Sequence, residues 1–313
     1  MQQPPLLSDA LAALLEGVPR KDLAVAAKAI SDGYRSGASS QAIATPLQAA
    51  AYATVRMPAT YAASSAVFAR LAEAVPDFAP RSLLDAGAGT GAASWAALTA
   101  WPDLQTITML EPNPALRSLA RRLAESGPLA KAEFLSGSLD AEKPHADLVV
   151  ASYVLAELPE DKAAAVARDL WQSAKSALAL IEPGTPQGFA RIRAARAALI
   201  EAGAHVAAPC THDNVCPMTG DDWCHFSQRL PRSRDHMLLK DASVPFEDER
   251  YSYVAVTRVK VSSGARILAP PLETKPGLTF KLCDESGLHA QFVASRDKDK
   301  YRRVRKRGWG DLF

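Results

Sequence analysis

This chain lacks long hydrophobic runs, basic residues near its start and a strong net charge. No uninterrupted apolar stretch approaches the roughly 18 residues that a membrane-spanning helix needs, so we expect no association with a membrane. Residues 1–19 contain neither Lys nor Arg, which argues against a secretory signal and against an Arg-rich mitochondrial presequence. We therefore expect a bacterial cytoplasmic protein, and we favour the mitochondrial matrix less.

Cysteine and aromatic residues are also scarce. Four cysteines in 313 residues are too few for a disulfide framework, and in an intracellular chain they favour a metal site or redox chemistry. Hydrophobic residues make up 48% and charged residues 22%, which is typical of a soluble globular protein. The net charge is only +2, but residues 296–307 carry eight basic and two acidic side chains. A basic tail on an otherwise mildly acidic chain indicates contact with a polyanion.

The order of apolar segments predicts an α/β fold with three regions. Residues 1–80 are Ala-rich and helix-prone, with Pro58 among the expected breaks, and predict an N-terminal helical cap. Residues 81–204 alternate short apolar strands with helices, which predicts a mostly parallel sheet with a ligand at the strands' carboxyl ends. Residues 205–313 predict a cysteine cluster, a small β module that includes 251–259, and the basic tail. We expect strands at 82–84, 105–110, 134–135, 147–152 and 177–181, and helices at 114–126 and 161–175.

A glycine-rich loop follows the first expected strand. Its spacing is Asp85-x-Gly87-x-Gly89-x-Gly91, and Glu111 ends the next strand. Glycines let the backbone approach a ligand closely, and a carboxylate at the position of Glu111 can accept hydrogen bonds from ribose hydroxyls. The spacing resembles motif I of class I S-adenosylmethionine-dependent methyltransferases more than the dinucleotide fingerprint. The resemblance implies a Rossmann-like methyltransferase fold that binds S-adenosylmethionine through these five residues.

The segment after the fourth expected strand contains no familiar catalytic motif. Residues 151–159 lack the Asn/Asp-Pro-Pro-aromatic motif of amino-methyltransferases, and they lack a cysteine for covalent catalysis. Glu157 is the one candidate base, and it is equally consistent with a charged residue at a helix start. The sequence therefore leaves open whether the chain is an active enzyme or has kept donor binding and lost turnover.

The cysteines form the second informative pattern. Three follow a C-x5-C-x7-C spacing, and 58 residues separate the third from the fourth: Cys210, Cys216, Cys224 and Cys283. Four thiolates suit tetrahedral zinc or an iron–sulfur cluster, and four separate buried thiols are the alternative. The paired CxxC motifs of zinc ribbons are absent, and the wide, uneven spacing suits a larger cluster. His212 and His225 are alternative ligands, although histidines beside cysteines more often donate hydrogen bonds to them.

The basic tail predicts an RNA-binding surface. Its candidate phosphate-binding residues are Lys298, Lys300, Arg302, Arg303, Arg305, Lys306 and Arg307. Tyr301 and Trp309 are candidates for stacking on exposed bases. Four further basic residues are candidates to extend this surface: Arg229, Arg232, Arg234 and Lys240. A solvated tail without a partner is the alternative.

Four motifs together resemble one known family. They are 84–91, the Ile181-Glu182-Pro183-Gly184-Thr185-Pro186 segment, the 223–229 segment that begins Trp-Cys-His-Phe, and Gly308-Trp309-Gly310-Asp311. This combination resembles the methyltransferase-like assembly factors of the mitochondrial small ribosomal subunit and their bacterial relatives. The resemblance implies a 4Fe-4S cluster held by the four cysteines, and binding to small-subunit rRNA within a pre-ribosomal particle.

The resemblance also sets the functional alternatives. We expect a monomeric small-subunit assembly factor that has a methyltransferase fold and little or no catalysis. The alternatives are an active S-adenosylmethionine-dependent rRNA methyltransferase and an iron–sulfur redox sensor that controls RNA binding.

Overall fold

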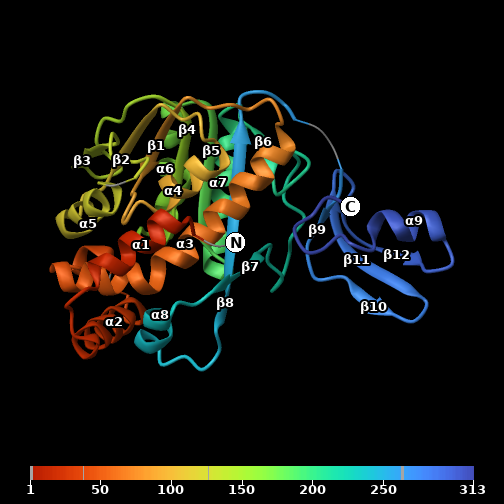
Figure 1. Ribbon diagram of the computed structural model, residues 1–313. Helices are drawn as coiled ribbons and strands as arrows, with labels where there is room; N and C mark the ends of the chain where they lie inside the picture. Colours follow the sequence, from red (N-terminus) through yellow and green to blue (C-terminus); the bar gives the residue numbers. More distant parts are fainter. Residues whose placement is uncertain (1–2, 38, 126, 262–263) are drawn as a thin grey trace.

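A parallel sheet forms the centre of the molecule. The computed structural model describes residues 3–37, 39–125, 127–261 and 264–313. Five strands lie parallel in the order β3-β2-β1-β4-β5 (Figure 1). Their bounds are Ser82–Ala86 (β1), Thr106–Leu110 (β2), Glu133–Leu135 (β3), Ala146–Ser152 (β4) and Ala174–Pro183 (β5). All five predicted strands are confirmed. Their sequences are short apolar runs because helices cover both faces of a parallel sheet and so bury its strands.

Three antiparallel strands extend the sheet beyond β5. β8 (Phe246–Thr257) pairs with β5, and β6 (His205–Ala208) and β7 (Phe226–Pro231) both pair with β8. The structure differs here from the predicted boundary at residue 205 and from the assignment of 251–259 to the small β module. The physical reason is burial. Val254, Ala255 and Val256 are fully buried, because β8 lies inside the central sheet, where helices cover both faces of the strand.

Two layers of helices enclose this sheet. α3 (Pro46–Ala74), α4 (Ala92–Ala100) and α5 (Pro114–Ala124) share one apolar core, and α6 (Ala163–Ser173) and α7 (Pro186–Glu201) share the other. The sheet order and the helical layers confirm the predicted class I methyltransferase, Rossmann-like fold. α1 (Pro5–Leu14), α2 (Arg20–Arg35) and the short turn η1 (Ser40–Ala42) precede α3.

α3 is longer than the sequence predicts. It continues through Pro58, where we expected a break. Proline removes one backbone hydrogen bond and crowds the preceding turn. Burial of Ala53, Met57 and Tyr61 in the core offsets that cost. The N-terminal region is therefore part of the core layer as well as a cap.

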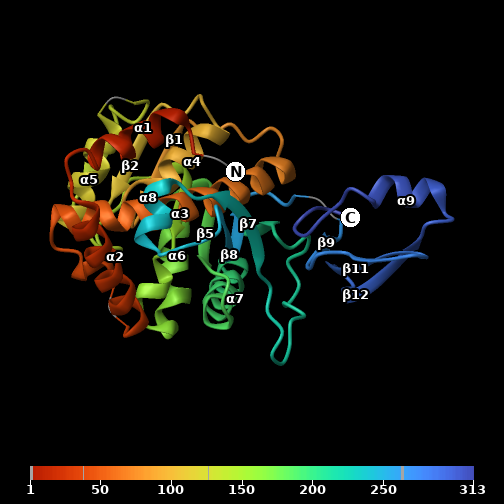
Figure 2. The same ribbon diagram turned by 60° about the horizontal axis from the view of Figure 1, so that its bottom comes forward.

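A small β module lies to one side of the core (Figure 2). It contains β9 (Arg266–Ile267), β10 (Leu272–Thr274), β11 (Gly277–Asp284) and β12 (Gly287–Ala294), followed by α9 (Lys298–Val304). Phe280, Leu282 and Val304 belong to its own buried cluster. The remaining short elements are η2 (Leu155–Glu157), η3 (Glu160–Lys162) and α8 (Arg234–Leu239).

The end of the chain returns to join the module to the core. The Asp311 backbone oxygen accepts a hydrogen bond from the Ile267 amide, and the Asp311 carboxylate lies 2.5 Å from the Arg70 guanidinium of α3. Within the described ranges, the structure contains no helix that is both long and apolar enough to span a bilayer.

Candidate functional site

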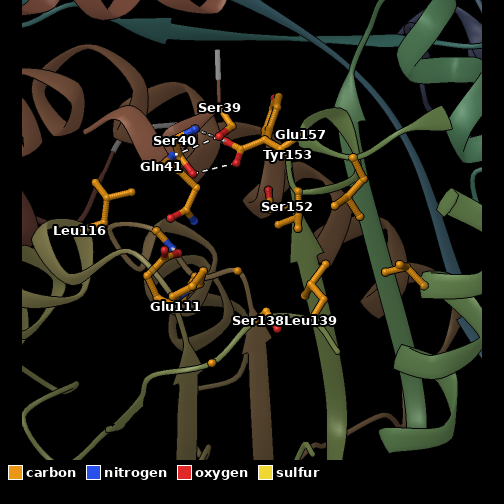
Figure 3. Close-up of a pocket in the computed structure, with 18 of the residues that line it drawn as sticks. Ser39, Ser40, Gln41, Glu111, Leu116, Ser138, Leu139, Ser152, Tyr153 and Glu157 are labelled. Atoms are coloured by element: carbon orange, nitrogen blue, oxygen red, sulfur yellow. Dashed lines mark hydrogen bonds between the residues drawn. The ribbon is translucent and has the colours of Figure 1, made fainter. Parts of the chain in front are cut away.

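A cavity of about 780 Å³ opens at the carboxyl ends of the parallel strands. Its floor is built by the loops that follow β1, β2, β3 and β4, and its roof by the segment before α3 and by α3 itself (Figure 3). Lining residues include Gly87, Gly89, Glu111, Gly137, Ser138, Tyr153, Glu157, Ser39, Ser40, Gln41, Tyr52 and Met57. This is where an open parallel sheet binds its ligand.

The three glycines of the loop have different reasons for being glycine. All adopt positive φ, at 74° for Gly87, 56° for Gly89 and 83° for Gly91. A Cβ on Gly87 would lie 2.5 Å from Val154, and one on Gly91 would lie 3.2 Å from the Met109 sulfur, so packing requires these two. A Cβ on Gly89 would meet no atom within 4 Å, so its backbone faces open space. Gly87 and Gly89 line the cavity, whereas Gly91 begins α4 and does not.

Asp85 lies outside the cavity wall. Its carboxylate accepts hydrogen bonds from the Ser94 amide at 3.1 Å and the Ser94 hydroxyl at 2.7 Å, so it ties β1 to the first turn of α4. Burial raises the pKa of Asp85 to about 6, and the bonds from Ser94 oppose that shift. Asp85 therefore shapes the loop from behind, and the structure does not bring its carboxylate to the cavity as the predicted cofactor contact requires.

Glu111 does line the cavity. One carboxylate oxygen accepts a hydrogen bond from the Gly89 amide at 2.7 Å, and the other accepts one from the Asn113 amide at 2.7 Å. Burial raises the pKa of Glu111, and these two bonds oppose the shift. Each oxygen keeps a further lone pair, so the carboxylate can still accept bonds from a ligand's hydroxyl groups. The structure thus brings Glu111 together with the loop glycines, as its predicted role requires.

Glu157 binds the roof of the cavity. Its carboxylate accepts hydrogen bonds from the Ser40 hydroxyl at 2.7 Å and the Ser40 amide at 3.1 Å (Figure 3). It also accepts one from the Tyr34 hydroxyl at 3.5 Å. Both oxygens are therefore engaged by the N-terminal region, and the candidate base instead holds the roof segment in place. Sequence reasoning missed Ser39, Ser40 and Gln41, because no motif marks a short polar turn as the roof of a distant cavity.

Tyr153 occupies the position directly after β4. It adopts φ of 61°, which is strained for a bulky residue and is typical of functional positions. Its hydroxyl donates to Glu249 at 2.7 Å, and Arg56 lies 3.3 Å from the same carboxylate and over the Tyr153 ring. Burial raises the pKa of the Tyr153 hydroxyl well above its ordinary value. This hydroxyl therefore stays protonated and donates to Glu249. No sequence motif predicts this contact.

All four cysteines line one small cavity between α7, β8 and β11. The volume of this cavity is about 30 Å³. Burial raises the pKa of Cys210, Cys224 and Cys283, in the last case to about 12. The described residues contain no group of three or more His, Cys, Asp or Glu side chains placed to hold a metal ion. The four thiols therefore line one cavity, as predicted. They are not arranged closely enough to hold a single metal ion.

The two candidate histidines have different surroundings. His212 is buried, and its Nε2 lies 3.6 Å from the Cys283 sulfur. His225 stacks on Trp223 at 5.0 Å between ring centres and does not line the cysteine cavity. His212 therefore lies where it can form a hydrogen bond with the Cys283 thiol. His225 instead belongs to an aromatic cluster with Trp223 and Trp309.

Two buried arginines border the cysteine cavity. Arg266 is 1% exposed and donates to the backbone oxygens of Pro209 at 2.8 Å and Gly310 at 2.9 Å. Arg196 is 5% exposed and donates to the His212 backbone oxygen at 2.7 Å. Buried positive charges require nearby negative charge or strong acceptors. Sequence reasoning missed both residues, because arginines within a helix or a short strand look like surface residues.

The basic tail lies on α9 and the segment that follows it. All seven of its predicted RNA-binding side chains are exposed: Lys298, Lys300, Arg302, Arg303, Arg305, Lys306 and Arg307. Lys300 and Arg302 lie near Asp297 and Asp299, respectively. Trp309 packs against His225 at 5.0 Å and Phe226 at 6.4 Å, so the structure does not present it for stacking on a base.

The second group of basic residues does not extend this surface. Arg229 pairs with Asp248, whereas Arg232 and Lys240 pair with Glu247. These residues lie on β7, on α8 and beside them, and α9 stands away from α8 in both views (Figures 1 and 2). We expected these residues to extend the basic surface of the tail. They do not, because acidic partners on β8 neutralise three of the four side chains.

The sheet order, the glycine loop and the cavity at the strand ends define a class I S-adenosylmethionine methyltransferase fold. Residues 46–313 match the profile of the family described as mitochondrial small ribosomal subunit Rsm22. The chain belongs to this family, which confirms the resemblance drawn from its motifs.

Relatives of known name agree with this family. The chain is 28% identical over 285 residues to the human protein named ribosome assembly protein METTL17, mitochondrial, and the match covers 84% of this chain and 61% of the human one. It is 26% identical over 351 residues to Rsm22-cox11 tandem protein 2, mitochondrial, of Schizosaccharomyces pombe, covering 94% of this chain and 46% of that one. The chain thus spans about three-fifths and one-half of these relatives.

Solved structures are more distant. A magnesium protoporphyrin IX methyltransferase from Synechocystis, with bound S-adenosylmethionine, is 18% identical, with a TM-score of 0.43 over 64% of this chain and 80% of that one.

The expected bacterial cytoplasmic location is wrong. The family is described as a mitochondrial small-subunit family, and the human and fission yeast relatives are named as mitochondrial proteins. Our expectation depended on the lack of basic residues in the first nineteen positions, and that feature does not outweigh the relatives.

The buried Asp85 carboxyl predicts a pH-dependent stability. Its folded pKa of about 6 exceeds the ordinary value of 3.8, so its stabilising contribution is present below about pH 4 and is lost as the pH rises through 6. We expect Asp85→Asn to gain stability relative to the parent protein between pH 4 and 7, by roughly 2–3 kcal/mol. Denaturant unfolding at each pH measures this difference.

A variant of Asp147 provides the opposite control. Hydrogen bonds from Arg81 and Ser82 lower the pKa of Asp147 despite its partial burial. Asp147→Asn should therefore lose stability relative to the parent protein as the pH rises through the Asp147 titration. Equal slopes for the two variants would contradict the assignment of Asp85 as a buried carboxyl whose pKa is raised by folding.

Proposed function

We propose that this chain acts in the assembly of a small ribosomal subunit as an rRNA-binding protein that carries an iron–sulfur cluster. In this proposal the chain also binds S-adenosylmethionine, and its role does not require methyl transfer. The observation that carries the proposal is the meeting of four cysteines, distant in sequence, at the junction between the methyltransferase-fold core and the module with the basic helix. The printed name of the human relative, a ribosome assembly protein, supports the same role.

The arrangement of the cysteines favours a cluster over zinc. Zinc ribbons use paired CxxC motifs, which this sequence lacks, and the C-x5-C-x7-C spacing is wider and uneven. The four thiols line one common cavity, so all four could ligate a single cluster. Cys210, Cys216, Cys224 and Cys283 would hold the cluster, and Arg196 and Arg266 would balance its negative charge. When bound, such a cluster supplies four iron–thiolate bonds that cross-link the core and the module.

Replacing one cysteine tests the cluster directly. We expect Cys224→Ser to lose visible absorption and most bound iron and sulfide, and to lower the melting temperature of the anaerobically purified protein. The physical reason is that a missing thiolate breaks the bond between the segment before β7 and the shared centre.

The control leaves the four thiols in place. His225→Ala changes a ring beside Cys224 that does not line the cavity, and it should keep iron and sulfide at parent levels. Zinc in place of iron in the parent protein, or an unchanged spectrum after Cys224→Ser, would refute the cluster.

Geometry at the large cavity supports binding of S-adenosylmethionine. The Gly89 backbone faces open space, and Glu111 is held beside it by a hydrogen bond from the Gly89 amide. Glu111 is placed to accept bonds from ribose hydroxyls, and Gly137 and Ser138 line the part of the cavity after β3. The Glu157 carboxylate binds Ser40 of the cavity roof, and the Tyr153 hydroxyl donates to Glu249, so each of these groups has a structural partner that does not require methyl transfer.

Donor binding is tested at Glu111. We expect Glu111→Ala to weaken S-adenosylmethionine binding about tenfold or more, because a charge-assisted hydrogen bond contributes about 1.5–3 kcal/mol. Isothermal calorimetry measures the affinity. Glu133→Ala, at an exposed carboxylate on β3, should bind like the parent protein, and equal affinity of the Glu111 variant would exclude the assigned role.

The exposed cations of α9 and of the segment after it support contact with RNA phosphates. Arg303, Arg305, Lys306 and Arg307 are exposed within five residues. α9 lies on the side of the module away from the core sheet (Figure 2). Folded RNA is recognised largely through shape and phosphate contacts, so the surface indicates no base preference.

Salt dependence tests this surface. Replacing Arg303, Arg305, Lys306 and Arg307 together with Ala should weaken binding to small-subunit rRNA and flatten the plot of log affinity against log salt by about 0.7–0.9 per lost phosphate contact. Filter binding at several salt concentrations provides the slope.

The matched control removes cations that already have acidic partners. Arg232→Ala with Lys240→Ala, which removes two partners of Glu247, should leave the slope unchanged. A parent-like slope in the α9 variant would show that RNA is bound elsewhere or not at all.

A further inference from the structure

The cysteine cavity contains a buried hydroxyl that has no partner. Tyr253 of β8 lines the cavity and is 3% exposed. Its hydroxyl oxygen is buried and forms no hydrogen bond with any described residue. A buried hydroxyl without a partner costs about 1–3 kcal/mol, so such groups usually have a ligand or another unseen partner.

A second unpartnered donor borders the same space. Arg196 of α7 lines the cavity, and its Nε is buried without a hydrogen-bond acceptor although its Nη2 donates to His212. Cys210 lines the same cavity as Arg196. Two unsatisfied donors, from two different elements, thus meet around four sulfur atoms.

We propose that the Tyr253 hydroxyl and the Arg196 guanidinium donate hydrogen bonds to the sulfurs of the cluster and thereby raise its reduction potential. This inference rests on the proposed cluster. Sulfur bound to iron carries negative charge and accepts hydrogen bonds, and those bonds stabilise the reduced, more negative state. Tyr253 is a positioning residue here, because it donates to the centre without ligating it.

The surrounding contacts favour this role for Tyr253. Phe226 and Tyr251 pack against its ring at 5.3 and 5.8 Å between ring centres, so the ring, and with it the hydroxyl oxygen, is held in place. The hydroxyl of the adjacent residue, Ser252, donates to the Cys224 backbone oxygen at 2.8 Å, which fixes Cys224 relative to β8. One strand therefore positions both a thiol ligand and a donor directed to the same centre.

The test is Tyr253→Phe, which removes one oxygen atom and keeps the ring. The control is Tyr251→Phe, which makes the same change two residues earlier, at a tyrosine that does not line the cavity. We expect both variants to hold iron and sulfide at parent levels. In a spectroelectrochemical titration, only Tyr253→Phe should shift the midpoint potential, and the shift should be to a more negative value.

A second measurement begins with the parent protein. Pulsed paramagnetic resonance of the reduced parent protein should detect exchangeable protons coupled to the cluster, and one coupling should vanish in Tyr253→Phe. Absence of such protons in the parent protein, a potential unchanged in a loaded Tyr253→Phe variant, or a cluster that accepts no electron would each overturn the inference. Absence of iron and sulfide from the parent protein would instead overturn the proposed cluster first, and iron analysis detects that before any titration.

Discussion

The junction between the core sheet and the C-terminal module is the contact on which both halves of the molecule depend. Arg266 opens the module, yet its buried guanidinium binds the backbone at Pro209 and Gly310. Asp311 at the chain's end pairs with Arg70 of α3. The four cysteines lie at the same junction. A charge as deeply buried as Arg266 is stable only while its acceptors stay in place, so the fold of the chain's last residues and the shape of the cysteine cavity stabilise each other.

Much of the core could be predicted from the sequence because its signals are local. The five parallel strands are short apolar runs between helical segments, and the glycine loop has a fixed spacing. Features that depend on distant partners could not be predicted. Pro58 lies inside α3 because tertiary burial outweighs its local effect, and β8 joins the central sheet because β5 is its partner.

The candidate site divides in the same way. Glycine spacing and an acidic strand end identified Gly87, Gly89 and Glu111, and counting cysteines identified the thiols. Asp85 was assigned to the cofactor although it binds Ser94, because a sequence does not show which face of a strand end a carboxylate takes. Trp309 looked like a stacking residue, yet it packs against His225. Tyr253, Arg196 and the Ser40 roof segment have no sequence signature, since each has meaning only beside residues far along the chain.

α3 connects the large cavity with the end of the chain. Its Met57 lines the cavity, and its Arg70 binds the chain's last turn. These residues are thirteen positions apart, which corresponds to about 20 Å along a helix. One helix therefore supplies both a wall of the cavity and an anchor for the C-terminal module, so helix geometry, and not a loop, sets the spacing between these two places.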